Sequence, residues 1–240
     1  QEAVAACVNG DTVWVKDGFE CTPADGYSDD QTTKVLIGKS TIQVNANITL
    51  RGETGNWQTG PIVRGSKTDS IRCIGVPFNN ASGSKFTLIG FRLEDGATDA
   101  NGGGVYMDPR NGLVTNCCVV GCSGKYGGGI YCKGSSEIVC CCVISNCTVT
   151  TGGGGACATA ALDCYNTLFE NNVAGANGGG GYAIKTSSGY CPILSNCTFR
   201  GNVTGSNIGT VGIENATTYA PTFIDCTFEA NAAQEGSAIG

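Results

Sequence analysis

A short pattern that recurs along the chain constrains its fold more than any other feature. Three copies are clear, and in each a phenylalanine is followed three residues later by an asparagine. Degenerate copies precede them, and the equivalent positions of all six copies are 24 to 30 residues apart: Leu93, Val119, Val143, Phe169, Phe199 and Phe228. Glycine runs such as Gly102–Gly104 and Gly127–Gly129 lie between the copies. A period of this length predicts a solenoid of stacked repeats.

The repeat consists of short β-branched or aromatic runs separated by Gly and Asn, which predicts strands joined by turns. Stacked coils are spaced by about 4.8 Å, so equivalent residues form columns. We expect the apolar column defined above to point inward and to contain an aromatic ladder of Phe169, Phe199 and Phe228. A second column is expected at a turn, where stacked amides bond the backbone and one another: Asn146, Asn172, Asn202 and Asn231.

Sixteen of the 240 residues are cysteine, a content that favours an exported protein. Adjacent coils bring equivalent Cα atoms within disulfide distance. This makes four pairs disulfide candidates: Cys7 with Cys21, Cys117 with Cys141, Cys118 with Cys142, and Cys132 with Cys157. The alternative is that inward cysteines are small buried hydrophobic residues with free thiols. A zinc site is disfavoured because the chain lacks paired Cys-x-x-Cys units.

The Phe-x-x-Asn motif and the glycine-rich motif resemble the repeats of chlamydial polymorphic outer-membrane proteins. More broadly, the chain is similar to right-handed parallel β-helices of the pectate-lyase-like type. The resemblance implies an all-β fold, a single-stranded right-handed parallel β-helix. From the number of repeats and short strands we estimate about seven or eight coils. We expect one domain over residues 1–240, with an N-terminal cap and first strands in residues 1–30 and clear repeats in residues 86–240.

Composition excludes several function classes. The chain has no histidine, which removes imidazole-dependent catalysis and His-ligated metals, and its formal charge of −6 disfavours a nucleic-acid partner. No apolar run approaches the length of a transmembrane helix. Fold relatives that act on polysaccharides place carboxylates, calcium and a basic residue on one sheet face, whereas the acids here are scattered. We therefore predict no catalytic residue, no metal and no cofactor.

A weak binding site is predicted on the strands that follow the glycine runs. Tyr106 and Tyr131 are 25 residues apart, each with a charged residue two positions later, Asp108 and Lys133. Tyr182 and Lys185 belong to the same region two coils further on. If these side chains point outward, they form an aromatic stripe of the kind that sugars and proteins bind. The alternative is that tyrosine is simply a good strand residue.

The prediction is a secreted or cell-surface scaffold without enzymatic activity, an adhesin or surface passenger that binds glycans or proteins. The C-terminal end shows no cap, so head-to-tail stacking into a fibre is the second hypothesis. A polysaccharide lyase or hydrolase is the third.

Overall fold

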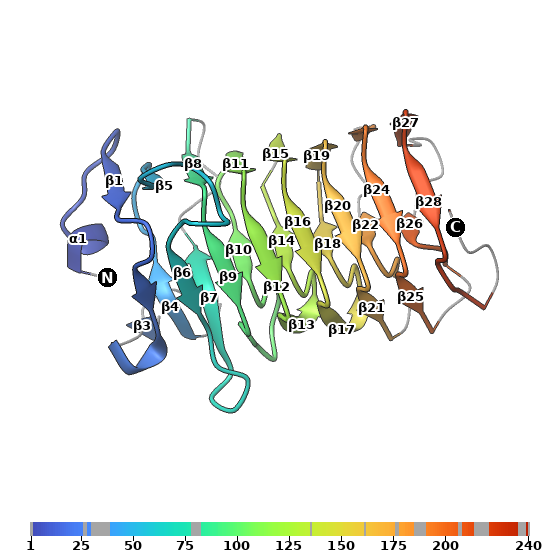
Figure 1. Cartoon of the computed structure of the whole chain (residues 1–240), viewed down its shortest axis with the longest axis horizontal. Coiled ribbons are helices and arrows are strands. Elements are labelled where there is room, and N and C mark those ends of the chain that lie inside the picture. The colour runs from blue at the N-terminus through green and yellow to red at the C-terminus, as the bar shows by residue number, and fades with distance from the viewer. Residues whose placement is uncertain are drawn as a thin grey trace.

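The computed structural model describes residues 2–25, 28–29, 39–77, 83–134, 136–160, 162–175, 178–184, 191–205, 208–213, 221–234 and 239. These residues form a rod in which short strands stack along the long axis, from the N-terminal helix α1 (Glu2–Ala5) to the last strands (Figure 1). A 3-10 turn, η1 (Pro23–Asp25), lies near the N-terminal end, between β2 and β3. Among the described strands, all pairings are parallel except that of β3 with β4, and one isolated antiparallel bridge joins Ser66 and Ile71. The fold is therefore an all-β parallel β-helix, which confirms the predicted fold class.

The described strands form four sheets, which are the walls of the solenoid. Sheet A, along the upper edge of Figure 1, holds β1 (Thr12–Val15), β5 (Thr49–Gly52), β8 (Lys85–Ile89), β11 (Asn111–Thr115), β15 (Glu137–Cys140), β19 (Leu162–Tyr165), β23 (Ile193–Ser195) and β27 (Thr222–Ile224). Sheet B holds β2 (Glu20–Cys21), β6 (Ile62–Arg64), β9 (Arg92–Glu94), β12 (Cys118–Val120), β16 (Val143–Ser145), β20 (Leu168–Glu170), β24 (Thr198–Arg200) and β28 (Thr227–Glu229).

Sheet C holds β3 (Ser28–Asp29), β4 (Lys39–Gln43), β7 (Ile71–Val76), β10 (Val105–Met107), β14 (Ile130–Cys132), β18 (Ala156–Ala158), β22 (Tyr182–Ile184) and β26 (Val211–Ile213). The small sheet D holds β13 (Ser123–Tyr126), β17 (Thr148–Gly152), β21 (Val173–Ala174) and β25 (Val203–Thr204). About five turns are regular, and less regular turns extend the stack at both ends. The seven or eight coils expected slightly exceed the number of regular turns.

One hydrophobic core runs through the stack, because alternate residues of each strand point inward. Its buried members extend from Val4 in the cap to Val211 near the last turns. The predicted aromatic ladder is confirmed: the ring of Phe199 stacks on Phe169 at 4.9 Å and on Phe228 at 5.1 Å, measured between centroids. The three residues are in register on adjacent strands of sheet B.

The asparagine ladder is confirmed for three of its four predicted members. Asn202 Oδ1 accepts hydrogen bonds from the backbone N and the side-chain Nδ2 of Asn172, both at 3.0 Å, and Asn231 Oδ1 accepts the equivalent pair from Asn202. The amide nitrogens of Asn172, Asn202 and Asn231 each donate to a backbone oxygen of an adjacent coil at 2.9 Å. Buried polar side chains are thus satisfied by their own neighbours in the column.

Asn146 and Val143 do not lie in their predicted columns. Ile144 pairs with Val119 and Phe169 and is fully buried, while Val143 points outward beside Cys118. The ladder position in this coil is therefore Cys147, and Asn146 takes the preceding turn position with a φ of 53°. A slip of one residue exchanges the two faces of a strand, and the repeated cysteines here give no signal for either register.

None of the four predicted disulfides is present, since all sixteen cysteines lie among the described residues and are free thiols. Cys141 occupies an exposed turn position with a φ of 54°, so the buried neighbour of Cys117 is Cys142 rather than Cys141. The Cys118–Cys142 prediction is wrong for the same reason. Cys132 points into the core beside Met107, whereas Cys157 lies on the outer side beside Tyr131.

The remaining predicted pair, Cys7 and Cys21, also stays reduced. The Cys7 thiol donates a hydrogen bond to Ala3 O at 3.1 Å, and Cys21 is buried in register with Val63 of the next coil. Most cysteines of this chain therefore serve as small buried residues, which is the alternative that the sequence left open for the inward ones.

Candidate functional site

The predicted tyrosine stripe is reduced to one pair of stacked rings, and this pair is buried. Tyr106 and Tyr131 are in register on β10 and β14, and their ring centroids are 5.7 Å apart with an interplanar angle of 20°. The rings are on the outer side of sheet C but are only 4% and 6% exposed. They form a second, smaller cluster with Cys157 and Ala183. The prediction of an exposed aromatic stripe is therefore wrong, because strand alternation says which side a residue faces but not what covers that side.

Tyr182 is not part of this stripe. It pairs with Ala156 and Val211, which are core positions, and it is fully buried. Its hydroxyl donates a hydrogen bond to Leu162 O at 2.7 Å, so its polar end is satisfied inside the solenoid. Lys185, predicted with it, lies outside the described residues.

Asp108 and Lys133, which follow the paired tyrosines, form an ion pair between adjacent coils. Lys133 Nζ lies 2.9 Å from Asp108 Oδ2, and the other carboxylate oxygen of Asp108 is buried without a hydrogen-bond partner. The Asp108 side chain is 9% exposed and that of Lys133 is 41% exposed. The sequence placed these two residues together correctly, although the arrangement leaves little of the carboxylate open to a ligand.

A buried arginine that the sequence analysis missed packs over the first tyrosine. The guanidinium carbon of Arg72 lies 5.2 Å from the ring centroid of Tyr106, and its Nη2 donates to Thr98 Oγ1 at 3.1 Å. Burial lowers the pKa of Arg72 to about 10. Burial and, next, the charge of Asp108 raise the pKa of the Tyr106 hydroxyl. An arginine inside an otherwise apolar strand was the signal that could have found it.

Glu137, the second missed residue, points into the core. On neighbouring strands of sheet A, Phe86, Gly112, Glu137 and Leu162 occupy one inward column, so Glu137 lies between Gly112 and Leu162. Its side chain is fully buried, and neither carboxyl oxygen has a hydrogen-bond partner. Burial raises the pKa of this carboxyl to about 9, so the group is protonated at neutral pH. Strand alternation from Val139 could have placed it inside.

Arg72, Tyr106 and Glu137 combine shifted pKa values with burial. Such shifts are typical of functional sites, but buried structural groups produce them as well. Here the largest cause is burial for each of Arg72, Tyr106 and Glu137. The chemistry available here is therefore that of one neutral buried acid, Glu137, and one partly buried ion pair, Asp108 with Lys133.

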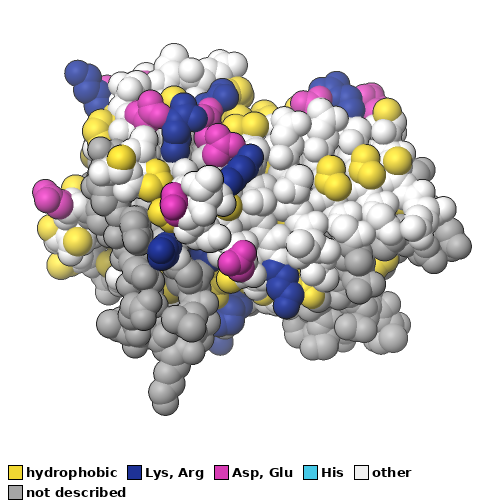
Figure 2. Space-filling view, turned by 90° about the horizontal axis from the view of Figure 1, so that it is seen from below, with side chains coloured by type: hydrophobic (Ala, Val, Ile, Leu, Met, Phe, Trp, Pro, Cys, Tyr) yellow, Lys and Arg dark blue, Asp and Glu magenta, His cyan; other side chains and the backbone are white. Residues whose placement is uncertain are grey.

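Several acidic side chains on the outer faces are paired with cations. Glu94 contacts both Arg64 and Arg92, Glu170 lies 2.8 Å from Arg200, and Asp95 lies 3.1 Å from Lys67. On the face shown in Figure 2, acidic and basic side chains lie side by side rather than in patches of one sign. Among the described residues, no group of three or more Cys, Asp or Glu side chains is arranged to hold a metal ion.

The comparisons with known proteins agree with the fold. The family model described as "Right handed beta helix region" matches residues 103–240, more than half of the chain. No curated protein and no solved structure matches the chain, and the resemblance to chlamydial repeats is not confirmed. In the part of the chain that the structure describes, no helix has the length and apolar character needed to cross a membrane.

Proposed function

Because the chain belongs to the right-handed β-helix family, which includes enzymes and non-enzymes, we propose that it is a non-enzymatic scaffold that presents a rigid face to a protein partner. We place it at the cell surface or outside the cell, as an adhesin or surface passenger. The family and the continuous core support a rigid rod. The protein partner, rather than a glycan, is favoured because the tyrosines suited to stacking on sugars are buried.

The observation that carries the proposal is the composition of the outer face of sheet B. In its middle, Val120, Val143 and Leu168 are half-buried and face outward on three neighbouring strands. Toward the two ends of the sheet lie arginine–glutamate pairs, one formed by Arg64 and Arg92 with Glu94, the other by Arg200 with Glu170. An apolar centre with a polar rim is the usual anatomy of a protein-binding surface.

The test is binding of the purified chain to a panel of immobilised extracellular proteins and to a glycan array. Leu168→Lys puts a charge in the centre of the face and is expected to weaken protein binding at least tenfold, since buried apolar contacts dominate such interfaces. Val173→Lys is the matched control, because Val173 is exposed on sheet D, away from this face. Antibody labelling of intact cells tests the location.

Three results would contradict this proposal. Equal loss of binding in both variants would place the contact elsewhere, binding to glycans alone would select the other ligand class, and depolymerisation of a polysaccharide would select the enzyme hypothesis.

Self-stacking into a fibre is the second candidate, and one observation favours it. In the last described turn, Phe223 and Phe228 are only partly buried, although their equivalents in the preceding coil, Leu194 and Phe199, are fully covered. Another copy of the chain could cover them in a head-to-tail contact. Light scattering and negative-stain microscopy test this, since Phe228→Lys is expected to abolish any rods that the unaltered chain forms.

A further inference from the structure

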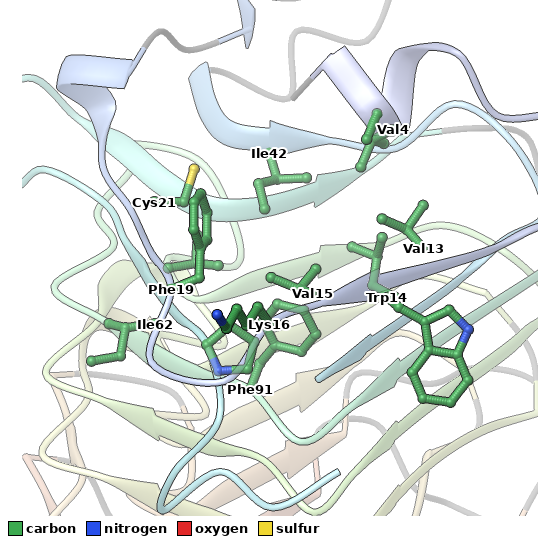
Figure 3. A pocket seen from close by; sticks show the side chains of 14 residues that line it. Val4, Val13, Trp14, Val15, Lys16, Phe19, Cys21, Ile42, Ile62 and Phe91 are labelled. Carbon is green, nitrogen blue, oxygen red and sulfur yellow. The ribbon is translucent and has the colours of Figure 1, made fainter. Parts of the chain in front are cut away.

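An apolar pocket of about 390 Å³ lies inside the first turn of the solenoid, at its N-terminal end (Figure 3). Leu50 and Val63 of the second turn line it together with Val15 and Ile42 of the first. Val4 of the cap helix α1 lines it from the opposite end. A volume of this size lies within the range of roughly 300–1,000 Å³ that is usual for small-molecule sites.

The pocket is open because one side chain that could fill it is displaced. Glu20, Ile62 and Arg92 are in register on three neighbouring strands. The residues that precede them, Phe19, Pro61 and Phe91, therefore occupy equivalent positions. Phe91 is 1% exposed, whereas Phe19 is 53% exposed and leaves the corner of the first turn unfilled.

One cation borders this apolar space. Lys16 lines the pocket, its side chain is exposed, and it makes no ion pair with a described residue. The neighbouring charged groups are already engaged: Asp17 accepts hydrogen bonds from Thr54 and Thr59, and Glu20 contacts Arg64. Arg51 lies over the ring of Trp14 at 5.1 Å. In Figure 3, Lys16 lies beside Val15 and Phe91.

We propose that this pocket binds a free long-chain monocarboxylate, with the acyl chain in the apolar interior and the carboxylate at Lys16. The apolar lining removes the chain from water, which strengthens binding about fourfold for each methylene that enters. Among the side chains that line the described pocket, the unpaired Lys16 is the only one with a positive charge to pair with a carboxylate. The ligand class follows from this combination of one cation and an otherwise apolar wall.

The experiment measures binding of the fluorescent fatty acid cis-parinarate to the full chain, with displacement by decanoate, dodecanoate and dodecanol. We expect saturable binding at one site per chain and tighter binding of dodecanoate than of decanoate. Lys16→Gln is expected to weaken dodecanoate binding twofold to fivefold, roughly the strength of an exposed ion pair, and to leave dodecanol unchanged. Lys85→Gln, at an exposed lysine outside this pocket, is the matched control.

A second pair of variants tests the cavity itself. Val15→Phe fills the pocket and is expected to weaken cis-parinarate binding more than tenfold, whereas Val173→Phe adds the same ring on the exposed side of sheet D. If Val15→Phe does not fold by circular dichroism, Ile62→Trp narrows the same pocket from a half-buried position.

Several results would overturn the proposal: no saturable binding, equal binding in the filled and control variants, or an effect of Lys16→Gln on dodecanol as large as on dodecanoate. Binding to phosphatidylcholine vesicles without binding to free dodecanoate would assign the pocket to a membrane surface and would also overturn it. None of these results bears on the face of sheet B, so the proposed scaffold function is tested separately.

Discussion

Replacing Glu137 by glutamine changes how the stability of this protein depends on pH. The carboxyl is fully buried in the core with no hydrogen-bond partner, and its pKa is raised from 4.5 to about 9. Between these two pH values the unfolded chain has lost the proton and the folded chain keeps it. The folded state therefore binds more protons, so stability is highest below pH 4.5 and falls as the pH rises toward 9.

The magnitude follows from the width of this window. Each pH unit corresponds to about 1.4 kcal/mol, so at pH 7 the group contributes a loss of about 3 kcal/mol relative to the acid side. Glu137→Gln cannot ionise and removes this slope. Glu137→Leu also removes the buried polar atoms and is expected to be about 3 kcal/mol more stable than the unaltered chain at pH 7, because Leu162 occupies the same column on the next strand.

The assay is urea unfolding followed by circular dichroism between about pH 5 and pH 8, where the proton difference is fully developed. The measured quantity is the free energy of unfolding of the unaltered chain minus that of the variant. We expect this difference to fall by about 1.4 kcal/mol per pH unit, which corresponds to one proton. Glu53→Gln, at an exposed glutamate, is the control and is expected to give a flat difference. Parallel curves for the Glu137 variants and the unaltered chain would refute the reasoning, since they require a carboxyl that ionises alike in both states.

Three further predictions concern the ladders and the thiols. Phe199→Ala removes a buried ring stacked on both sides and is expected to lower the free energy of unfolding by about 4 kcal/mol in urea titrations. Phe228→Ala is expected to cost clearly less, because that ring is partly exposed. Equal losses in the two variants would contradict this account. Asn202→Ala leaves donors of Asn172 unpaired and is expected to cost about 3 kcal/mol. Asn196→Ala is expected to cost only about 1 kcal/mol, because its side-chain hydrogen bond is exposed and its cost comes from the left-handed backbone at a φ of 53°. Equal costs would argue against the ladder. Ellman's reagent is expected to react rapidly with the two exposed thiols, Cys141 and Cys191, and with all sixteen after denaturation, whereas a lower final number would indicate disulfides.

The repeat by itself determined the parallel β-helix and most of its columns. The ladders of Phe169, Phe199 and Phe228 and of Asn172, Asn202 and Asn231 follow from a nearly constant spacing, because equivalent residues in stacked coils must be neighbours. The pairing of Asp108 with Lys133 follows from the same spacing.

The tertiary structure decided what periodicity leaves undetermined. In the run Cys140–Cys142, either of two registers keeps an alternating pattern, and only packing in the core selected Ile144 and Cys142 as the inward residues. The burial of Tyr106 depends on what lies over an outer face, and the pocket beside Lys16 depends on how the first turn closes. These features are set by contacts between segments that are far apart in the sequence, and a local repeat does not encode which segments meet. The columns can therefore be predicted from the sequence, whereas the residues that cover them and the cavities between them cannot.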